Sequence, residues 1–385
     1  MDRKRDLREE IPKKQLSNAV GFDEVAIVPG DFTINPDMVA TSFSIGNHEF
    51  EIPILSSAMD AVSSPDFVVE LNKMGGLGVM NLEGIYTRYK NPEIALEEIC
   101  QASKEESIHT IQRIYSRPIE ENLIGERISK IKEKNVICAV SVTPANTKRF
   151  SAIAVEAGAD ILVVQSTVST ARHISRSYKG LVFPDLLKKI SIPVVVGNCV
   201  TFSAALELLE TGIHGILVGV GPGAACTTRE VVGVGVPQVT ATIETTSARD
   251  YFYNSTGKYI PIITDGGIRS GGDFCKAIVA GADAVMLGTP FAQSEEAAGK
   301  GFNWGMATSD TALPRGARIS VGTIGTLREI LFGPSSNNNG TQNLIGALRT
   351  SMGMCGAITL KDMHEAELII APSIKTEGKY FQHRN

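Results

Sequence analysis

Features that define several protein classes are missing from this chain of 385 residues. No apolar run reaches the ~18 residues of a membrane span, and the opening segment MDRKRDLREEIPKKQ is charged throughout, unlike a signal peptide. The six cysteines are dispersed without a CxxC pair, and no histidines cluster at metal-ligand spacing. We therefore expect a cytoplasmic protein with reduced thiols, without a disulfide scaffold, structural zinc or membrane partner.

A strongly basic surface is missing as well. Lys and Arg number 37 against 42 Asp and Glu, which gives a formal net charge of −5 at pH 7. Non-specific nucleic-acid binding needs a broad surface that neutralises phosphates, so we expect small molecules and no nucleic acid as partners. Glycine is the one surplus, with 37 residues, and it suits tight turns and ligand sites lined by backbone.

Short apolar runs rich in β-branched residues, each bounded by turn signals, predict eight strands. They cover residues 52–55, 77–80, 136–140, 161–164, 192–196, 215–218, 261–263 and 284–287. Segments with helical spacing lie between most of them, at 65–74, 145–157, 202–210 and 274–280. Strictly alternating strands and helices form a parallel sheet. The span 52–289 is about 240 residues, close to the ~250 of a (β/α)8 barrel. We predict an α/β protein with a TIM barrel, and a doubly wound open sheet is the alternative.

Three connections are longer than ordinary strand-to-helix loops. Residues 82–135 have helical, polar patterns and predict helices inserted into a single catalytic domain that spans 1–385. Residues 219–259 contain a Gly-Pro-Gly loop, and 290–385 form a long C-terminal extension. We expect the last two to supply an active-site loop, a flap and subunit contacts.

The residues that follow the predicted strands are small, polar or nucleophilic, and barrel chemistry sits at these carboxyl ends. After strands seven and eight come Asp265-Gly266-Gly267 and Gly288-Thr289, at the loops where barrels commonly bind phosphate. Asp265 offers two acceptor oxygens to a ribose diol, with a helix cap as the alternative role.

Cys226 stands at the end of the Gly-Pro-Gly loop in the segment GPGAACTTR and is the sharpest chemical signal in the chain. A free thiol is only a few per cent thiolate at neutral pH, so a nucleophilic cysteine needs donors or positive charge nearby. Loop amides, Thr228 and Arg229 are the candidates. The other five cysteines fit small buried hydrophobes. His214 precedes the sixth strand, at the wrong end of the barrel for catalysis, so we expect a structural role.

These motifs resemble the IMP dehydrogenase and GMP reductase superfamily from about residue 16 to about 357. The resemblance is carried by GPGAACTTR followed by GVGVPQ, by FDEVAIVPG and SSAMDAVSS, and by LIGALRTSMGMCGA. It implies that Cys226 attacks C2 of IMP, that hydride passes to NAD, and that water releases XMP from the thioimidate. It also implies guanine nucleotide biosynthesis and a homotetramer.

The resemblance further implies a role for each matching residue. The residues implied to bind the nucleotide are Ser57, Met59, Asn198, Asp265, Gly266, Gly267, Gly288, Thr289, Gly305 and Met306. The residues implied to meet the cofactor are Gln165, Ser166 and Asn198. The carbonyls of Gly221, Gly223 and Cys226 match a potassium site, and Thr228 matches a threonine that helps to activate water.

Departures from the family pattern indicate a short branch. Residues 82–135 are too few for the tandem CBS pair of full-length enzymes. Gln165 replaces an aspartate, Ala224 a serine, and Arg315 a glutamate that reads the purine. No Arg-Tyr pair follows Met306, so Thr228 and Arg315 remain as candidates for activating water. The alternatives are GMP reduction with NADPH, IMP binding with weak catalysis, and a flavin-binding barrel oxidoreductase.

Overall fold

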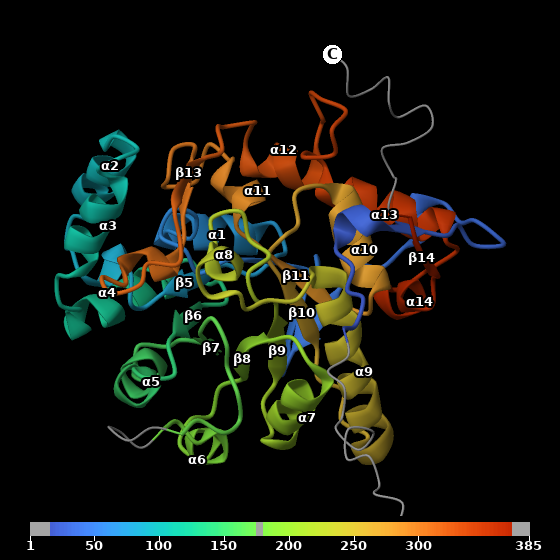
Figure 1. Ribbon diagram of the computed structural model, residues 1–385, viewed down its shortest axis with the longest axis horizontal. Helices are drawn as coiled ribbons and strands as arrows, with labels where there is room; N and C mark the ends of the chain where they lie inside the picture. The colour runs from blue at the N-terminus through green and yellow to red at the C-terminus, as the bar shows by residue number, and fades with distance from the viewer. Residues whose placement is uncertain (1–15, 175–179, 372–385) are drawn as a thin grey trace, which may run out of the picture.

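An eight-stranded parallel barrel forms the centre of the computed structural model, which describes residues 16–174 and 180–371 (Figure 1). The strands are β4 (Ile54–Ser56), β5 (Val79–Asn81), β6 (Ala139–Val142), β7 (Ile161–Gln165), β8 (Val194–Cys199), β9 (Gly215–Val218), β10 (Ile262–Asp265) and β11 (Ala284–Leu287). β11 pairs with β4, and a parallel bridge between Leu55 and Leu77 joins β4 to the segment before β5. The sheet therefore closes, which confirms the predicted (β/α)8 barrel and excludes the open sheet.

The barrel strands are apolar because both of their faces are buried. Along β7, Ile161 and Val163 belong to one hydrophobic cluster, whereas Leu162 and Val164 belong to another. The first cluster contains alternate residues of other strands, such as Val195, and the second contains residues of the surrounding helices. Alternate side chains thus fill the barrel or pack under the helices, as the two-residue period of a strand requires.

All four segments with helical spacing are helices. They are α1 (Pro65–Lys73), α5 (Thr147–Glu156), α7 (Phe202–Glu210) and α10 (Gly271–Val279). α1 begins with two common start signals: Pro65 in the first turn and Ser64, whose hydroxyl accepts the N–H of Phe67 at 3.0 Å. The remaining helices after strands are α6 (Phe183–Leu187), α8 (Thr228–Val232), α9 (Gln238–Thr256) and α11 (Thr289–Ala292).

The connection between β5 and β6 is helical, as predicted. It contains the 3-10 turn η4 (Ile85–Thr87) and helices α2 (Pro92–Gln101), α3 (Ser107–Tyr115) and α4 (Glu121–Lys132). We call residues 82–135 the insert. Figure 1 shows α2 and α3 standing beside the barrel, at the left of the view.

The segment after α11 first forms a hairpin and then three helices. We call residues 302–320 the flap; it contains β12 (Phe302–Trp304), the 3-10 turn η5 (Met306–Ser309) and β13 (Arg318–Ser320). The helices are α12 (Leu327–Phe332), α13 (Leu344–Met354) and α14 (Leu360–His364), followed by β14 (Leu368–Ile370).

The start of the described chain also packs on the barrel. It contains η2 (Phe22–Glu24), β1 (Val25–Ile27), η3 (Pro36–Met38) and a hairpin of β2 (Phe43–Ile45) and β3 (His48–Phe50). β1 pairs with β14 in antiparallel fashion, so the two ends of the described chain lie side by side.

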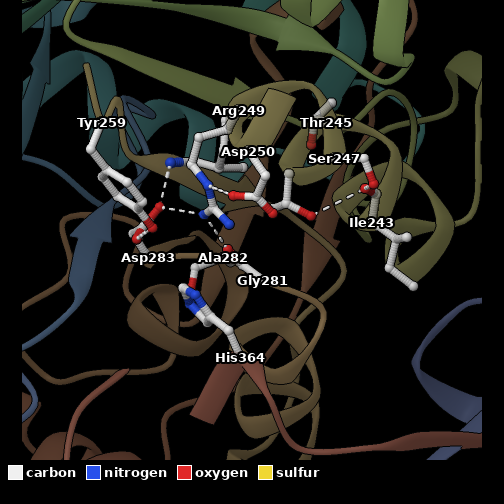
Figure 2. Close-up of polar contacts among 12 residues, drawn as sticks. Ile243, Thr245, Ser247, Arg249, Asp250, Tyr259, Gly281, Ala282, Asp283 and His364 are labelled. Atoms are coloured by element: carbon white, nitrogen blue, oxygen red, sulfur yellow. Dashed lines mark hydrogen bonds and ion pairs between the residues drawn. The ribbon is translucent and has the colours of Figure 1, made fainter. Parts of the chain in front are cut away.

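A buried ion pair joins α9 to the amino end of the barrel, opposite the predicted site (Figure 2). Arg249, with 3% of its side chain exposed, donates to Asp283 at 3.0 Å and to the Gly281 carbonyl at 2.7 Å. The Tyr259 hydroxyl donates to the other Asp283 oxygen at 2.6 Å. At the same end, His214 accepts the Val194 N–H at 3.2 Å, and burial lowers its pKa. These contacts fit the structural role expected for His214.

Within residues 16–174 and 180–371, no helix combines the length and the apolar character needed to cross a bilayer.

Candidate active site

The Cys226 loop runs from the end of β9 to the start of α8, at the carboxyl end of the barrel. It leaves the strand through Gly219, which has a φ of +146°. A Cβ at Gly219 would lie 2.2 Å from the Asp265 carbonyl oxygen, so only glycine lets this loop rest against β10. Pro222 in turn lies against Gly266 and Gly267. The cysteine loop and the predicted phosphate loop therefore pack together.

Cys226 is half-buried and has a hydroxyl partner. Its thiol donates to the Thr228 hydroxyl at 3.1 Å, and its backbone N–H donates to the Gly223 carbonyl at 3.0 Å. Thr228 is 1% exposed, so this hydroxyl is fixed in place. The structure thus brings together the two residues predicted for the chemistry on this loop.

The three fully buried cysteines lack the features of a nucleophile. Burial raises the pKa of Cys138, Cys199 and Cys275 to about 12, which keeps these thiols protonated at neutral pH. Their predicted role as small hydrophobes fits this environment.

Arg229 braces the loop. Its guanidinium donates to the Val220 carbonyl at 3.3 Å, at the start of the loop, and to the Val236 carbonyl, which follows α8. It was a candidate for activating the thiol, but the side chain that contacts the thiol is Thr228.

The flap lies directly on the cysteine loop. Cys226 and Gly316 form an antiparallel bridge, and the Ala317 N–H donates to the Ala225 carbonyl at 3.0 Å. The Thr227 N–H donates to the Arg315 carbonyl at 3.2 Å. A Cβ at Gly305 would lie 3.0 Å from the Ala225 oxygen. The structure therefore places two predicted flap residues, Gly305 and Arg315, beside the loop of the predicted nucleophile.

Two flap side chains present functional atoms near this loop. The Arg315 guanidinium lies 4.0 Å from the Asp310 carboxylate, while its Nε is buried without a hydrogen-bond partner. An unpaired buried donor is costly unless a ligand or water satisfies it. Met306, the predicted contact to the base, accepts a hydrogen bond from the Asn81 amide at 3.5 Å through its sulfur.

Asp265, Gln165 and Asn198 form one hydrogen-bonded cluster at the ends of β10, β7 and β8. Oδ2 of Asp265 accepts the Gln165 amide at 2.9 Å and the Asn198 amide at 2.8 Å. Gln165 also donates to the Asn198 side-chain oxygen at 3.1 Å. Burial raises the pKa of Asp265 to about 6, and the two amide donors oppose that rise. The backbone of Ser166 exchanges hydrogen bonds with Gly197 and Asn198, at 2.9 and 3.0 Å.

Four of the predicted nucleotide-binding residues meet between β4 and β11. The Ser57 N–H donates to the Leu287 carbonyl at 2.9 Å. A Cβ at Gly288 would lie 3.3 Å from the Ser57 hydroxyl and 3.4 Å from the Met59 sulfur. Thr289 follows as the first residue of α11. Ser57, Met59, Gly288 and Thr289 thus form one wall beside the Asp265 cluster.

The described residues contain no group of three or more His, Cys, Asp or Glu side chains that could hold a metal ion. A cation here would need backbone oxygens, as the predicted potassium site does. The turn at Gly221 has a φ of +77°, and the Gly223 carbonyl accepts one hydrogen bond, from Cys226, leaving a second lone pair. Carbonyl ligands of this kind suit a hard cation, so the loop's donor set fits the expectation.

Sequence reasoning missed a buried group behind the site, consisting of Asp60, Tyr115 and Trp304. Asp60 lies within the motif SSAMDAVSS, and a carboxylate followed by apolar residues was the one sequence feature that could have indicated a buried acid. Tyr115 lies in the insert, and no local pattern connects it to the flap.

Comparison with known proteins decides the family. Residues 19–311 match the family described as the IMP dehydrogenase / GMP reductase domain. The chain belongs to this family. Membership confirms the resemblance found in the motifs, and helices α2–α4 of the described insert stand where full-length IMP dehydrogenases were expected to carry CBS modules.

Relatives of this IMP dehydrogenase / GMP reductase family member cover nearly its full length. An uncharacterized oxidoreductase from Mycolicibacterium smegmatis is 36% identical, over 91% of this chain and 96% of that protein. An inosine-5'-monophosphate dehydrogenase from Borreliella burgdorferi is 31% identical, over 92% of this chain and 94% of that protein. The crystal structure of an IMP dehydrogenase/GMP reductase-like protein from Corynebacterium glutamicum superposes with a TM-score of 0.88 at 32% identity, covering 93% of this chain and 96% of that one.

Proposed function

We propose that this oxidoreductase-family protein is an IMP dehydrogenase, which oxidises IMP to XMP with NAD and water in guanine nucleotide biosynthesis. The observation that carries the proposal is the pairing of Cys226 with the Thr228 hydroxyl at 3.1 Å, beneath the flap. The predicted nucleophile, on the loop after β9, thus lies at the same end of the barrel as Asp265, whose carboxylate ends β10 and suits a ribose diol.

Cys226 supplies the covalent step. Its sulfur, after losing its proton, bonds to C2 of the purine, and the C2 hydride leaves. NAD, when bound, accepts that hydride. Water then adds to C2 of the thioimidate, the C–S bond breaks, and XMP leaves with the water oxygen. The Thr228 hydroxyl accepts from the thiol and can donate to the thiolate, so it stabilises both states.

Water activation falls to Thr228 and Arg315 in this proposal. The buried Nε of Arg315 has no protein partner and is a donor suited to an incoming water or purine oxygen. Removing general-base help in such a step typically costs ~10² to 10⁴ in rate.

The binding roles follow from the clusters at the strand ends. Asp265 holds the ribose, and Met59 and Met306 contact the base. The phosphate is held by Ser57, Gly266, Gly267, Gly288 and Thr289. Gln165, Ser166 and Asn198 meet the cofactor, with Gln165 supplying an uncharged amide. The carbonyls of Gly221, Gly223 and Cys226 hold potassium. A homotetramer is part of the same proposal.

GMP reduction is the second candidate, and the flap favours it in one respect. Residues 307–313 read ATSDTAL, which contains no Arg-Tyr pair to act as base in the hydrolytic step. GMP reduction would proceed through a Cys226 adduct without that hydrolysis, and would consume NADPH.

The test is NADH formation from IMP, NAD and potassium, with XMP identified by chromatography. Wild type should turn over, and Cys226→Ala should lose more than about 10³-fold in rate, because no other group replaces the nucleophile. Cys355→Ala is the matched control: it removes a half-buried thiol that donates to the Val28 carbonyl, far along the chain from the loop, and should keep its rate. Equal rates of NADH formation in the Cys226 variant and wild type would contradict the proposal. So would oxidation of NADPH that depends on added GMP, if no NADH forms from IMP.

A further inference from the structure

The insert holds both sides of the flap. Arg318 on β13 donates to the carbonyls of Ile99, Cys100 and Ala102 at 2.6, 3.0 and 2.8 Å. These carbonyls end α2, where a cation meets both unpaired acceptors and the negative end of the helix dipole. On the other side, the Gln112 amide of α3 donates to the Asp310 carbonyl, just after η5, at 3.2 Å. The contacts between α3 and η5 put the flap segment directly against the insert (Figure 1).

A network of buried hydrogen bonds runs from the flap through the insert to the barrel. Trp304, the only tryptophan in the sequence, is 0% exposed and donates from its indole to the Tyr115 hydroxyl at 3.1 Å. The Tyr115 hydroxyl donates to Asp60, which is 1% exposed and also accepts the Ile85 N–H at 2.9 Å. A hydrogen bond to a buried carboxylate is stronger than one between neutral groups.

Asp60 and Trp304, at the two ends of this hydrogen-bond network, are close in sequence to the two methionines that we assign to the purine. Asp60 directly follows Met59 on the loop after β4, and Trp304 is separated from Met306 only by Gly305. Tyr115 on α3 links these segments, which lie about 240 residues apart in the sequence. The hydroxyl of Tyr115 therefore joins the segment that carries Met59 to the segment that carries Met306.

The packing around this network is tight and belongs to the insert and the flap. Trp304 shares a hydrophobic cluster with Ile99, Ile111 and Ile114 of α2 and α3, separate from the two clusters of the barrel. A Cβ at Gly84 would lie 2.0 Å from Oδ1 of Asp60, so the backbone closes over the carboxylate. That Oδ1 is buried without a partner, a cost that packing alone does not explain.

We propose that α2 and α3 clamp the flap, and that Asp60, Tyr115 and Trp304 are positioning residues that hold Met306 opposite Met59 over Cys226. The inference rests on the proposed purine site, because the two methionines are assigned there. It gives the insert a task in the reaction although none of its helices needs to touch the substrate.

Tyr115→Phe tests the clamp, since it removes the central hydroxyl and keeps the ring. Tyr89→Phe is the matched control: its hydroxyl donates to the Ile114 carbonyl of α3 at 3.1 Å, so the variant removes a tyrosine hydrogen bond to the same helix that does not involve Trp304. Gln112→Ala, at the exposed contact to the flap, is a second variant that leaves the buried core intact.

Two measurements separate positioning from stability. The first is the rate at which iodoacetamide alkylates Cys226 without nucleotide, followed by peptide mass spectrometry. The second is the KM for IMP against kcat. In Tyr115→Phe we expect the alkylation rate and the KM each to change about tenfold, the equivalent of one charge-assisted hydrogen bond. Gln112→Ala should change both about threefold, and Tyr89→Phe less than twofold. Tyr115→Phe should also lower the melting temperature, because it leaves the buried Trp304 N–H and an Asp60 oxygen without their partner, so both measurements are made well below the melting temperature of every variant.

The two proposals fail in different ways. If Tyr115→Phe and Tyr89→Phe match in both measurements, the clamp is wrong, whatever the activity of the wild type. If the wild type forms no NADH from IMP but Cys226 alkylation still separates the two variants, the proposed reaction is wrong and the clamp stands. Trp304 emission, which comes from one residue only, reports the flap independently in every variant.

Discussion

Protonation of Asp265 should control nucleotide affinity. Oδ2 of this carboxylate already accepts two amides, at 2.8 and 2.9 Å, so Oδ1 is the oxygen that remains for a ribose hydroxyl. Burial raises its pKa to about 6. The ionised form accepts on both oxygens, whereas the protonated form must place a proton on one of them, so acid should weaken ribose binding.

The size of the effect follows from that pKa. If the ionised form alone binds, its population falls from about 99% at pH 8 to about 9% at pH 5, so the Kd for IMP should rise about tenfold between these values. Isothermal titration calorimetry without NAD gives the Kd directly. In paired buffers of different ionisation enthalpy, it should also show release of about half a proton by the protein at pH 6.

The phosphate of IMP also titrates near pH 6, so a variant is needed to distinguish its titration from that of Asp265. Gln165→Leu serves this purpose. The variant loses one amide that lowers the Asp265 pKa, so its affinity midpoint should move to higher pH, while the ligand phosphate is the same in both titrations. A Kd for wild type that stays flat from pH 8 to pH 5, or midpoints that coincide in the two proteins, would refute this reasoning.

Two further predictions concern parts of the molecule away from Asp265. Asp283→Ala should lower the free energy of unfolding by about 3 kcal/mol, because the buried Arg249 guanidinium loses its buried partner and keeps only Asp250, whose side chain is 57% exposed. A denaturant midpoint equal to wild type would contradict this, and Tyr259→Phe, which removes one hydrogen bond, should cost only ~1 kcal/mol. Replacing potassium by choline should lower kcat at least about tenfold, because the carbonyls of Gly221 and Gly223 would lose the cation that we propose for the Cys226 loop. An unchanged rate in potassium-free buffer would rule out that site.

The barrel could be predicted because its signal is local. Each buried strand is a short β-branched run, and 215–218 and 284–287 were placed without error as β9 and β11. The run 136–140 was placed three residues early relative to β6, because Val136 and Ile137 are apolar residues that pack half-buried before the strand begins. The pairing of β1 with β14 was missed, since no local pattern relates Val25 to Ile370.

The same distinction holds for the site. Cys226 and Asp265 could be predicted because glycine-rich loops at strand ends have little structural purpose of their own. The link between Asp60, Tyr115 and Trp304 could not, because a tyrosine and a tryptophan in amphipathic segments are typical core residues. Only tertiary structure shows that their polar atoms meet.

Barrel closure imposes an order on folding. β4 is complete once residue 56 has been synthesised, yet its partner β11 ends at Leu287, and β5 reaches it through the bridge at Leu77. During synthesis, the edge of β4 that pairs with β11 therefore stays unpaired while more than half of the polypeptide is made. Such non-local pairing is slow, and an unpaired strand edge invites association with other chains. The hairpin of β2 and β3 is made just before β4 and belongs to the same hydrophobic cluster, so β4 has apolar partners earlier in the chain before β11 exists.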